Sequence, residues 1–241
     1  MLKSARRRYF STAIGTKVVV GATGLLLVLY LLLHLAGNLL LYLGPESFNN
    51  YSHLLIKNPL VVPVEIGLAA TFVLHIYKAI TNYISNRRAR PVQYYQPVRR
   101  FFGWGWAGSN SRKSLASTTM IFTGLIVFVF LLIHLKQFKY GPEYAVAKAV
   151  PTGAAPEEIR DLYRLETEVF GNRFNVLFYG FCMLVVGAHV WHGFSSAFSS
   201  LGIEHRRYTP WLRTAGRVLA VVFAAGFSSI PIWVYFFGGR P

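Results

Sequence analysis

The sequence predicts an all-α integral membrane protein with five transmembrane helices, and three observations lead to this fold class. First, 54% of the 241 residues are hydrophobic and only 14% are charged, whereas about a quarter of the residues of a soluble domain are charged. Second, five segments reach the roughly 20 apolar residues that are needed to cross a hydrocarbon core about 30 Å thick. Third, these runs lack the alternation of apolar and polar residues that barrel strands show. Helices are then the structure in which their backbone N–H and C=O groups can be hydrogen-bonded in lipid.

The five predicted helices belong to one transmembrane domain that covers residues 1–241. They comprise residues 16–42, 60–84, 117–138, 174–200 and 211–238. The first helix is expected to be retained, because it is too long for a secretory signal and has a poor cleavage site after His34. Cys182 is the only cysteine and lies within a predicted span, which excludes a disulfide within this chain.

The net charge of +16 would suggest a nucleic-acid ligand in a soluble protein, but its distribution follows the predicted membrane instead. Basic residues gather in segments 3–17, 87–113 and 206–213, and most acids lie between residues 143 and 168. This positive-inside pattern predicts a bacterial cytoplasmic (inner) membrane protein with a cytoplasmic N-terminus and an external C-terminus. The basic surface would contact anionic membrane lipid or a cytoplasmic partner, and no nucleic acid is expected.

Two connections between the predicted helices are long. Residues 86–114 contain "RRFFGWGWAG", an aromatic and basic composition typical of a segment at the membrane interface. Residues 140–172 contain Pro156 followed by Glu157 and Glu158, a favourable start for a helix. A short surface helix beginning at Pro156 is therefore expected.

Histidines are the most informative residues of the predicted spans. Five of the seven lie inside spans, where ionisable side chains are costly and usually functional; they are His34, His75, His134, His189 and His192. The other two, His53 and His205, are expected to be solvated in loops. At 1.5 Å per residue, His34 and His134 lie towards the external face, and His75 and His189 lie towards the cytoplasm. The sequence thus predicts two pairs, each matched in depth.

Two imidazoles at equal depth with no carboxylate or thiolate beside them favour axial ligation of a haem iron. A flat porphyrin also requires small residues between helices, and Gly24, Gly124 and Gly193 are the candidates. His192 competes with His189 for the ligand position, because residues three apart share a helix face. The alternative is that these histidines are polar contacts between helices.

The first and third predicted helices carry the same motif. "TGLLLVLYLLLHL" at residues 23–35 and "TGLIVFVFLLIHL" at residues 123–135 agree at 7 of 13 positions. The repeat covers these two helices only, so convergent design explains it as well as duplication does.

Four further motifs occur together with these two segments, in order along nearly the whole chain: "STAIGTK", "NRRARPVQY", "GAHVWHGFSSAFSSLG" and "AGFSSIPIWVYF". With them the sequence resembles the cytochrome b558 membrane-anchor subunit of succinate dehydrogenase and fumarate reductase, the type with five helices and two haems. The resemblance implies a di-haem four-helix core plus a fifth helix. His34 and His134 would ligate the distal haem iron, and His75 and His189 the proximal one.

The resemblance further implies the assembly and the reaction. FAD and iron–sulfur clusters would belong to a flavoprotein subunit and an iron–sulfur subunit on the cytoplasmic face, in a complex that could form a higher oligomer. This chain would carry no succinate chemistry of its own. It would pass electrons of the succinate:quinone oxidoreductase, respiratory complex II, through two b haems to menaquinone or another quinone.

Quinone reduction needs a proton-donating group near the distal haem, for which Glu65, Asn38 and Tyr42 are the candidates. A glutamate that some fumarate reductases have two residues before the fourth ligand is replaced by Gly187, so the physiological direction stays open. Two other classes remain: the cytochrome b subunit of a hydrogenase or formate dehydrogenase, and a transporter that relays protons through its histidines.

Overall fold

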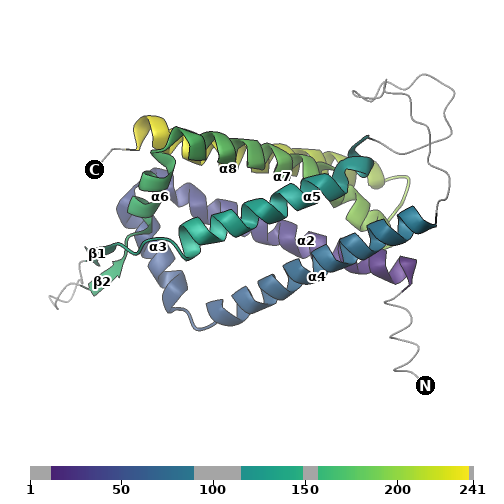
Figure 1. The fold of residues 1–241 in the computed structure, drawn as a ribbon, viewed down its shortest axis with the longest axis horizontal. Helices are drawn as coiled ribbons and strands as arrows, with labels where there is room; N and C mark the ends of the chain where they lie inside the picture. The colour runs from purple at the N-terminus through teal and green to yellow at the C-terminus, as the bar shows by residue number, and fades with distance from the viewer. Residues whose placement is uncertain (1–11, 90–114, 149–156, 239–241) are drawn as a thin grey trace. The chain divides into compact units, whose positions relative to one another are not determined.

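The computed structural model describes residues 12–89, 115–148 and 157–238 of the chain. Within them, five helices are long and apolar enough to cross a membrane. They are α2 (Ala13–Asn38) with the 3-10 turn η1 (Leu39–Leu43), α4 (Val61–Arg88), α5 (Leu115–His134) with the π-helical turn η2 (Leu135–Lys139), α7 (Arg173–Ser200) and α8 (Thr209–Phe237) (Figure 1). All five predicted spans are confirmed, and their ends differ from the prediction by a few residues. The chain is a multi-pass helical membrane protein.

The long helices expose apolar side chains, as helices surrounded by lipid do. No residue of α4 is buried, and Ile66 and Val73 on this helix are 65% and 66% exposed. In water such a surface would be a large hydrophobic patch, but hydrocarbon solvates it without cost.

The chain forms two compact units, and each long helix contributes residues to both. Unit 1 comprises Met1–Val28, Ala70–Leu125 and Ala188–Ala220. Unit 2 comprises Leu29–Ala69, Ile126–Gly187 and Val221–Pro241.

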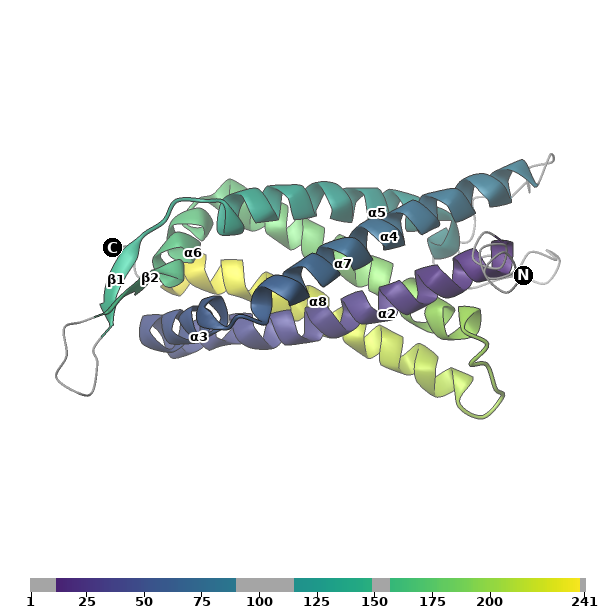
Figure 2. The ribbon, with the colours of Figure 1, turned by 90° about the horizontal axis from the view of Figure 1, so that it is seen from below.

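Unit 2 contains four short elements outside the spans, which we call the cap. They are α3 (Pro45–Lys57), β1 (Ala145–Lys148), β2 (Glu157–Arg160) and α6 (Leu162–Phe170). Figures 1 and 2 both show α3, α6 and the two strands close together at the same end of unit 2, and α3 contacts both β2 and α6.

Helix α3 was not predicted from the sequence, although its start carries a recognisable signal. Gly44 has a φ of +96° and leads into Pro45 in the first helical turn. Backbone N–H groups in this turn have no partner within the helix, so the missing N–H of proline costs nothing there. The helix buries Phe48, Asn49 and Ser52 on one face. Gly37 of α2 lets this helix approach closely, since a Cβ there would lie 2.8 Å from the Tyr51 ring.

The prediction of a helix beginning at Pro156 is wrong. Residues Glu157–Arg160 form β2, which pairs antiparallel with β1 so that Lys148 lies opposite Glu157. The helix begins only at Leu162, because Asp161 is its N-cap and accepts a hydrogen bond from the Arg164 backbone N–H at 3.0 Å. The cross-strand pairing of these residues with β1 takes the place of the predicted helical turn. Pro156 itself and residues 90–114 of the predicted interfacial segment lie outside the described residues.

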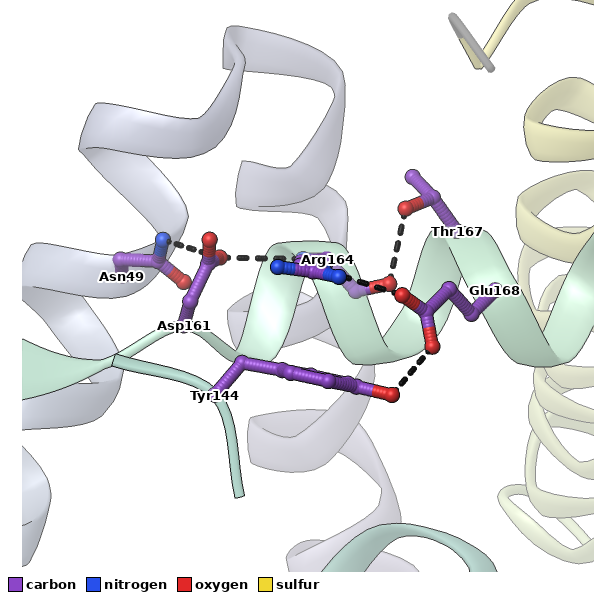
Figure 3. A network of polar contacts seen from close by, with 6 residues as sticks. All are labelled: Asn49, Tyr144, Asp161, Arg164, Thr167 and Glu168. Atoms are coloured by element: carbon purple, nitrogen blue, oxygen red, sulfur yellow. Dashed lines mark hydrogen bonds and ion pairs between the residues drawn. The ribbon is translucent and has the colours of Figure 1, made fainter. Parts of the chain in front are cut away.

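A polar network joins the cap elements (Figure 3). The Asn49 amide of α3 donates to the Asp161 carboxylate at 2.8 Å, and its oxygen accepts from the Tyr163 backbone N–H at 2.9 Å. In α6, the Arg164 side chain donates to Glu168 at 2.9 Å, and the Tyr144 hydroxyl donates to the same carboxylate at 2.5 Å. These two hydrogen bonds, the Tyr144 bond foremost, lower the pKa of Glu168. The network thus fixes α3 against the start of α6.

Candidate functional site

His75 of α4 and His189 of α7, here called the first pair, both lie in unit 1. The two imidazoles are close enough to interact electrostatically. Each ring also reaches the neighbouring helix that carries the repeated motif. Thr23 Oγ1 lies 3.0 Å from His75 Nδ1, and Thr123 Oγ1 lies 3.0 Å from His189 Nδ1.

The glycine after each threonine gives the imidazole room. A Cβ on Gly24 would lie 3.2 Å from His75 Cε1, and a Cβ on Gly124 would lie 3.3 Å from His189 Cε1. Such separations are tighter than ordinary van der Waals contact, so any larger residue would push the ring away. Gly24 and Gly124 were predicted as small residues between helices, and the structure places them against His75 and His189.

His34 of α2 and His134 of α5, the second pair, both lie in unit 2. Their ring centres are 5.9 Å apart and their planes are nearly perpendicular, at 86°. The residue four positions before each histidine stacks on it: Tyr30 lies 5.4 Å from His34 and Phe130 lies 5.6 Å from His134, between ring centres. The repeated motif therefore builds the same imidazole–aromatic contact on α2 and α5.

Further aromatic rings line the second pair. Phe138 and Tyr179 lie 5.2 and 6.1 Å from the His134 ring. Phe170 at the end of α6 is buried and packs against both of these rings, at 5.6 and 5.0 Å. The cap thus supports the rings of Phe138 and Tyr179 that contact His134.

The ring nitrogens of the second pair have weaker partners than those of the first. His134 Nδ1 is buried and has no hydrogen-bond partner in the part of the chain that the structure describes. The Asn38 amide donates to the His34 backbone carbonyl at 2.7 Å and lies 3.4 Å from His34 Nδ1. The short bond indicates that Asn38 mainly closes the end of α2.

The other two residues predicted near the quinone have distinct surroundings. The Tyr42 hydroxyl donates to Ser229 of α8 at 2.7 Å, and its ring packs on Trp233. Glu65 forms an ion pair with Lys139 at 2.5 Å, and the two side chains are 48% and 40% exposed. Glu65 also acts electrostatically on Tyr30, the ring that stacks on His34. Glu65 is therefore the candidate whose charge reaches the second pair.

The remaining histidines and Gly193 lie apart from these contacts. His192 is half-buried beside Trp191, with ring centres 6.4 Å apart, and Gly193 faces Met120 of α5. His205 is exposed, as predicted. The prediction for His53 is wrong: it lies in α3, only 13% of its side chain is exposed, and its Nε2 is 3.5 Å from Glu157. The unpredicted helix α3 explains this burial.

Glu166 of α6 was not predicted from the sequence as a functional residue. This residue is 6% exposed, its Oε2 has no partner among the described residues, and burial raises its pKa to about 8. It acts electrostatically on Tyr179, whose hydroxyl donates to Gln137 at 2.6 Å. Its position four residues before Phe170 puts it on the inward face of α6, a signal visible only once the start of that helix is known.

Among the residues that the structure describes, no three histidine, cysteine, aspartate or glutamate side chains gather into a metal-binding cluster. Each pair therefore offers two imidazoles without a carboxylate. Comparisons with protein-family models, with curated proteins and with solved structures find no match for this chain. The helices and the two sites define a multi-pass membrane protein with two half-buried imidazole pairs.

Proposed function

We propose that this chain is the di-haem cytochrome b membrane-anchor subunit of a succinate:quinone oxidoreductase. In this proposal it receives electrons from an iron–sulfur subunit bound on the cytoplasmic side and delivers them to quinone. The flavin and iron–sulfur chemistry belongs to the partner subunits.

The observation that carries the proposal is the proximity of the imidazoles within each pair. Transition-metal ions bind imidazole nitrogen at about 2 Å, so two rings sharing one ion have centres roughly 6 Å apart. The 5.9 Å between His34 and His134 fits this requirement. With only two protein ligands per pair, four coordination positions must come from the bound group, which a porphyrin supplies and a bare zinc or di-iron site does not.

The residues present also suit a haem in other respects. Stacked aromatic rings surround the second pair and exclude water, while the glycines seat the imidazoles of the first. When bound, a b-type haem supplies a one-electron couple at its iron. The histidines orient it, and the apolar lining sets the dielectric that tunes its potential.

Glu65 supports a quinone site near the second pair. Quinone reduction consumes protons, and Glu65 offers a half-exposed carboxyl group near the start of α4. Lys139 lies 2.5 Å from this carboxylate and forms an ion pair with it. The contacts of Asn38 and Tyr42 described above fit structural roles better.

A reduced-minus-oxidised absorption spectrum of membranes containing the chain tests the proposal. Two b-type haems are expected. His34→Ala and His134→Ala should each abolish the same haem signal, and His75→Ala and His189→Ala should each abolish the other. Spectra in which His34→Ala and His75→Ala remove one common haem would contradict the pairing.

The subunits that copurify with the chain distinguish the remaining classes. An FAD-containing partner that oxidises succinate agrees with the proposal, and a metal-containing hydrogenase or formate dehydrogenase contradicts it. Absence of any Soret absorption in the wild-type membranes would favour a proton-relaying transporter instead.

A further inference from the structure

The threonine that precedes Gly24 and the one that precedes Gly124 make the same three contacts. Besides approaching His75 Nδ1, the Thr23 hydroxyl lies 2.7 Å from the Val19 carbonyl and 3.2 Å from the Val20 carbonyl of its own helix. The Thr123 hydroxyl lies 3.3 and 3.1 Å from the carbonyls of Thr119 and Met120.

Counting protons at these contacts determines the direction of each histidine bond. A threonine hydroxyl has one proton, and a backbone carbonyl can only accept. In each copy the proton is donated to a carbonyl one turn earlier in the helix, so Oγ1 is left as an acceptor for the imidazole. Nδ1 must then carry the ring proton, and in a neutral imidazole Nε2 keeps the lone pair.

We infer that Thr23 and Thr123 are positioning residues that hold His75 and His189 in the tautomer with Nε2 free for a metal ion. The threonine and the glycine act together on one edge of the ring. Oγ1 holds Nδ1, and the glycine accommodates Cε1, the atom between the two nitrogens. This edge is fixed against the neighbouring helix, so the imidazole cannot turn over without losing its hydrogen bond.

The same contact also acts on the electronic state of the ligand. An Nδ1–H that donates to an oxygen makes the imidazole a stronger electron donor at Nε2, which stabilises the oxidised metal. Among the described residues the second pair shows no such acceptor, since His134 Nδ1 is unpartnered and the contact of His34 Nδ1 is the Asn38 amide nitrogen, at 3.4 Å. The threonines therefore make the two pairs electronically unequal. This inference rests on the proposed haem ligation.

Optical redox titration of the full chain in its complex, with Thr23→Val and Thr123→Val, tests the inference. Valine keeps the shape of threonine but removes the acceptor oxygen. Each variant should shift the reduction equilibrium of the first-pair haem towards the reduced form by up to about tenfold, which is 59 mV for a one-electron couple. The second-pair haem should be unchanged. Thr23→Ser, which restores an oxygen, should restore the wild-type potential.

Thr81→Val is the matched control, because Thr81 lies on α4 with His75 and, within the described part of the chain, its hydroxyl bonds the Lys78 carbonyl at 3.0 Å and no histidine. It should leave both haems unshifted. An unshifted first-pair haem in Thr23→Val, or an equal shift in Thr81→Val, would overturn the inference while leaving the haem ligation intact. A wild-type complex without haem would instead refute the proposed function. Should a valine variant lose its haem, nitrogen-15 NMR of labelled histidine in the haem-free wild-type chain reports the tautomer directly, and a proton on Nε2 of His75 would also overturn the inference.

Discussion

Glu166 makes the stability of the cap depend on pH, and Glu166→Gln should remove this dependence. The native carboxyl has its pKa raised to about 8, against 4.5 for a solvated glutamate. Between these values the native chain holds a proton that the unfolded chain releases. Unfolding therefore becomes easier as the pH rises from 4.5 to 8, and the loss is complete above the native pKa.

The size of the effect follows from the same two values. Each pKa unit corresponds to about 1.4 kcal/mol, so the difference gives an upper limit of about 5 kcal/mol. Relaxation of the cap around the ionised carboxylate will reduce it to a few kcal/mol. Glutamine has nearly the same shape and no charge. The variant should resemble the wild type near pH 5 and be more stable near pH 9.

Thermal unfolding in detergent, followed by tryptophan fluorescence between pH 5 and 9, measures this difference. The melting temperature of Glu166→Gln minus that of the wild type should increase steadily with pH. Glu158→Gln is the control, because Glu158 is an exposed residue of β2 in the same cap. Parallel curves for the wild type and Glu166→Gln over the whole range would refute the assignment of a buried, protonated carboxyl.

Three further results are expected. His192→Ala should leave both haems in place and shift at most one reduction potential, because His189 holds the contacts of the first pair. If the absorption spectrum shows that this variant loses a haem while His189→Ala does not, His192 is the ligand in place of His189. Glu65→Gln should slow succinate:menaquinone turnover while succinate oxidation with an artificial acceptor continues, and unchanged turnover would remove Glu65 from the quinone site. Asn49→Ala should destabilise the cap by about 1–3 kcal/mol, because two buried hydrogen bonds are lost; hydrogen exchange of the α6 amides should accelerate, and unaltered exchange would show that the bonds contribute little.

The five long helices could be predicted from the sequence because their signal is local and strong. Twenty apolar residues in a row have few alternatives in lipid, so composition alone locates each span. The association of His34 with His134 and of His75 with His189 was also predictable, since helix direction and residue rise give the depth of each side chain.

The cap could not be predicted in the same way. Strand β2 depends on pairing with β1, and no pattern within Glu157–Arg160 reveals a partner nine residues or more away. The Pro-Glu-Glu signal at residues 156–158 is a local preference that this non-local pairing overrides. The burial of His53 and Glu166 follows from the cap and was missed with it.

The contacts of the Thr-Gly pair with histidines of other helices were not predicted, for a different reason. Thr23 lies eleven residues before His34, and the sequence places both on one face of one helix. Sequence periodicity relates residues within a helix, whereas the partner of Thr23 is His75 on another helix. Only the packing of α2 against α4 reveals that contact.

The repeated motif consequently has two ends that contact different histidine pairs. The number of residues between the ends fixes the angle between their side chains around the helix axis. Thr-Gly at one end seats a histidine of another helix, and the aromatic residue and histidine at the other end belong to the second pair. Eleven residues are about three whole turns, so both ends point the same way; one inserted residue would rotate them by about 100° relative to each other. A single insertion between Gly24 and Tyr30 should therefore damage one pair or the other, whereas substitutions among the intervening lipid-facing leucines should be tolerated. The number of residues between the two ends of this motif is therefore more strictly constrained than the identity of the residues between them.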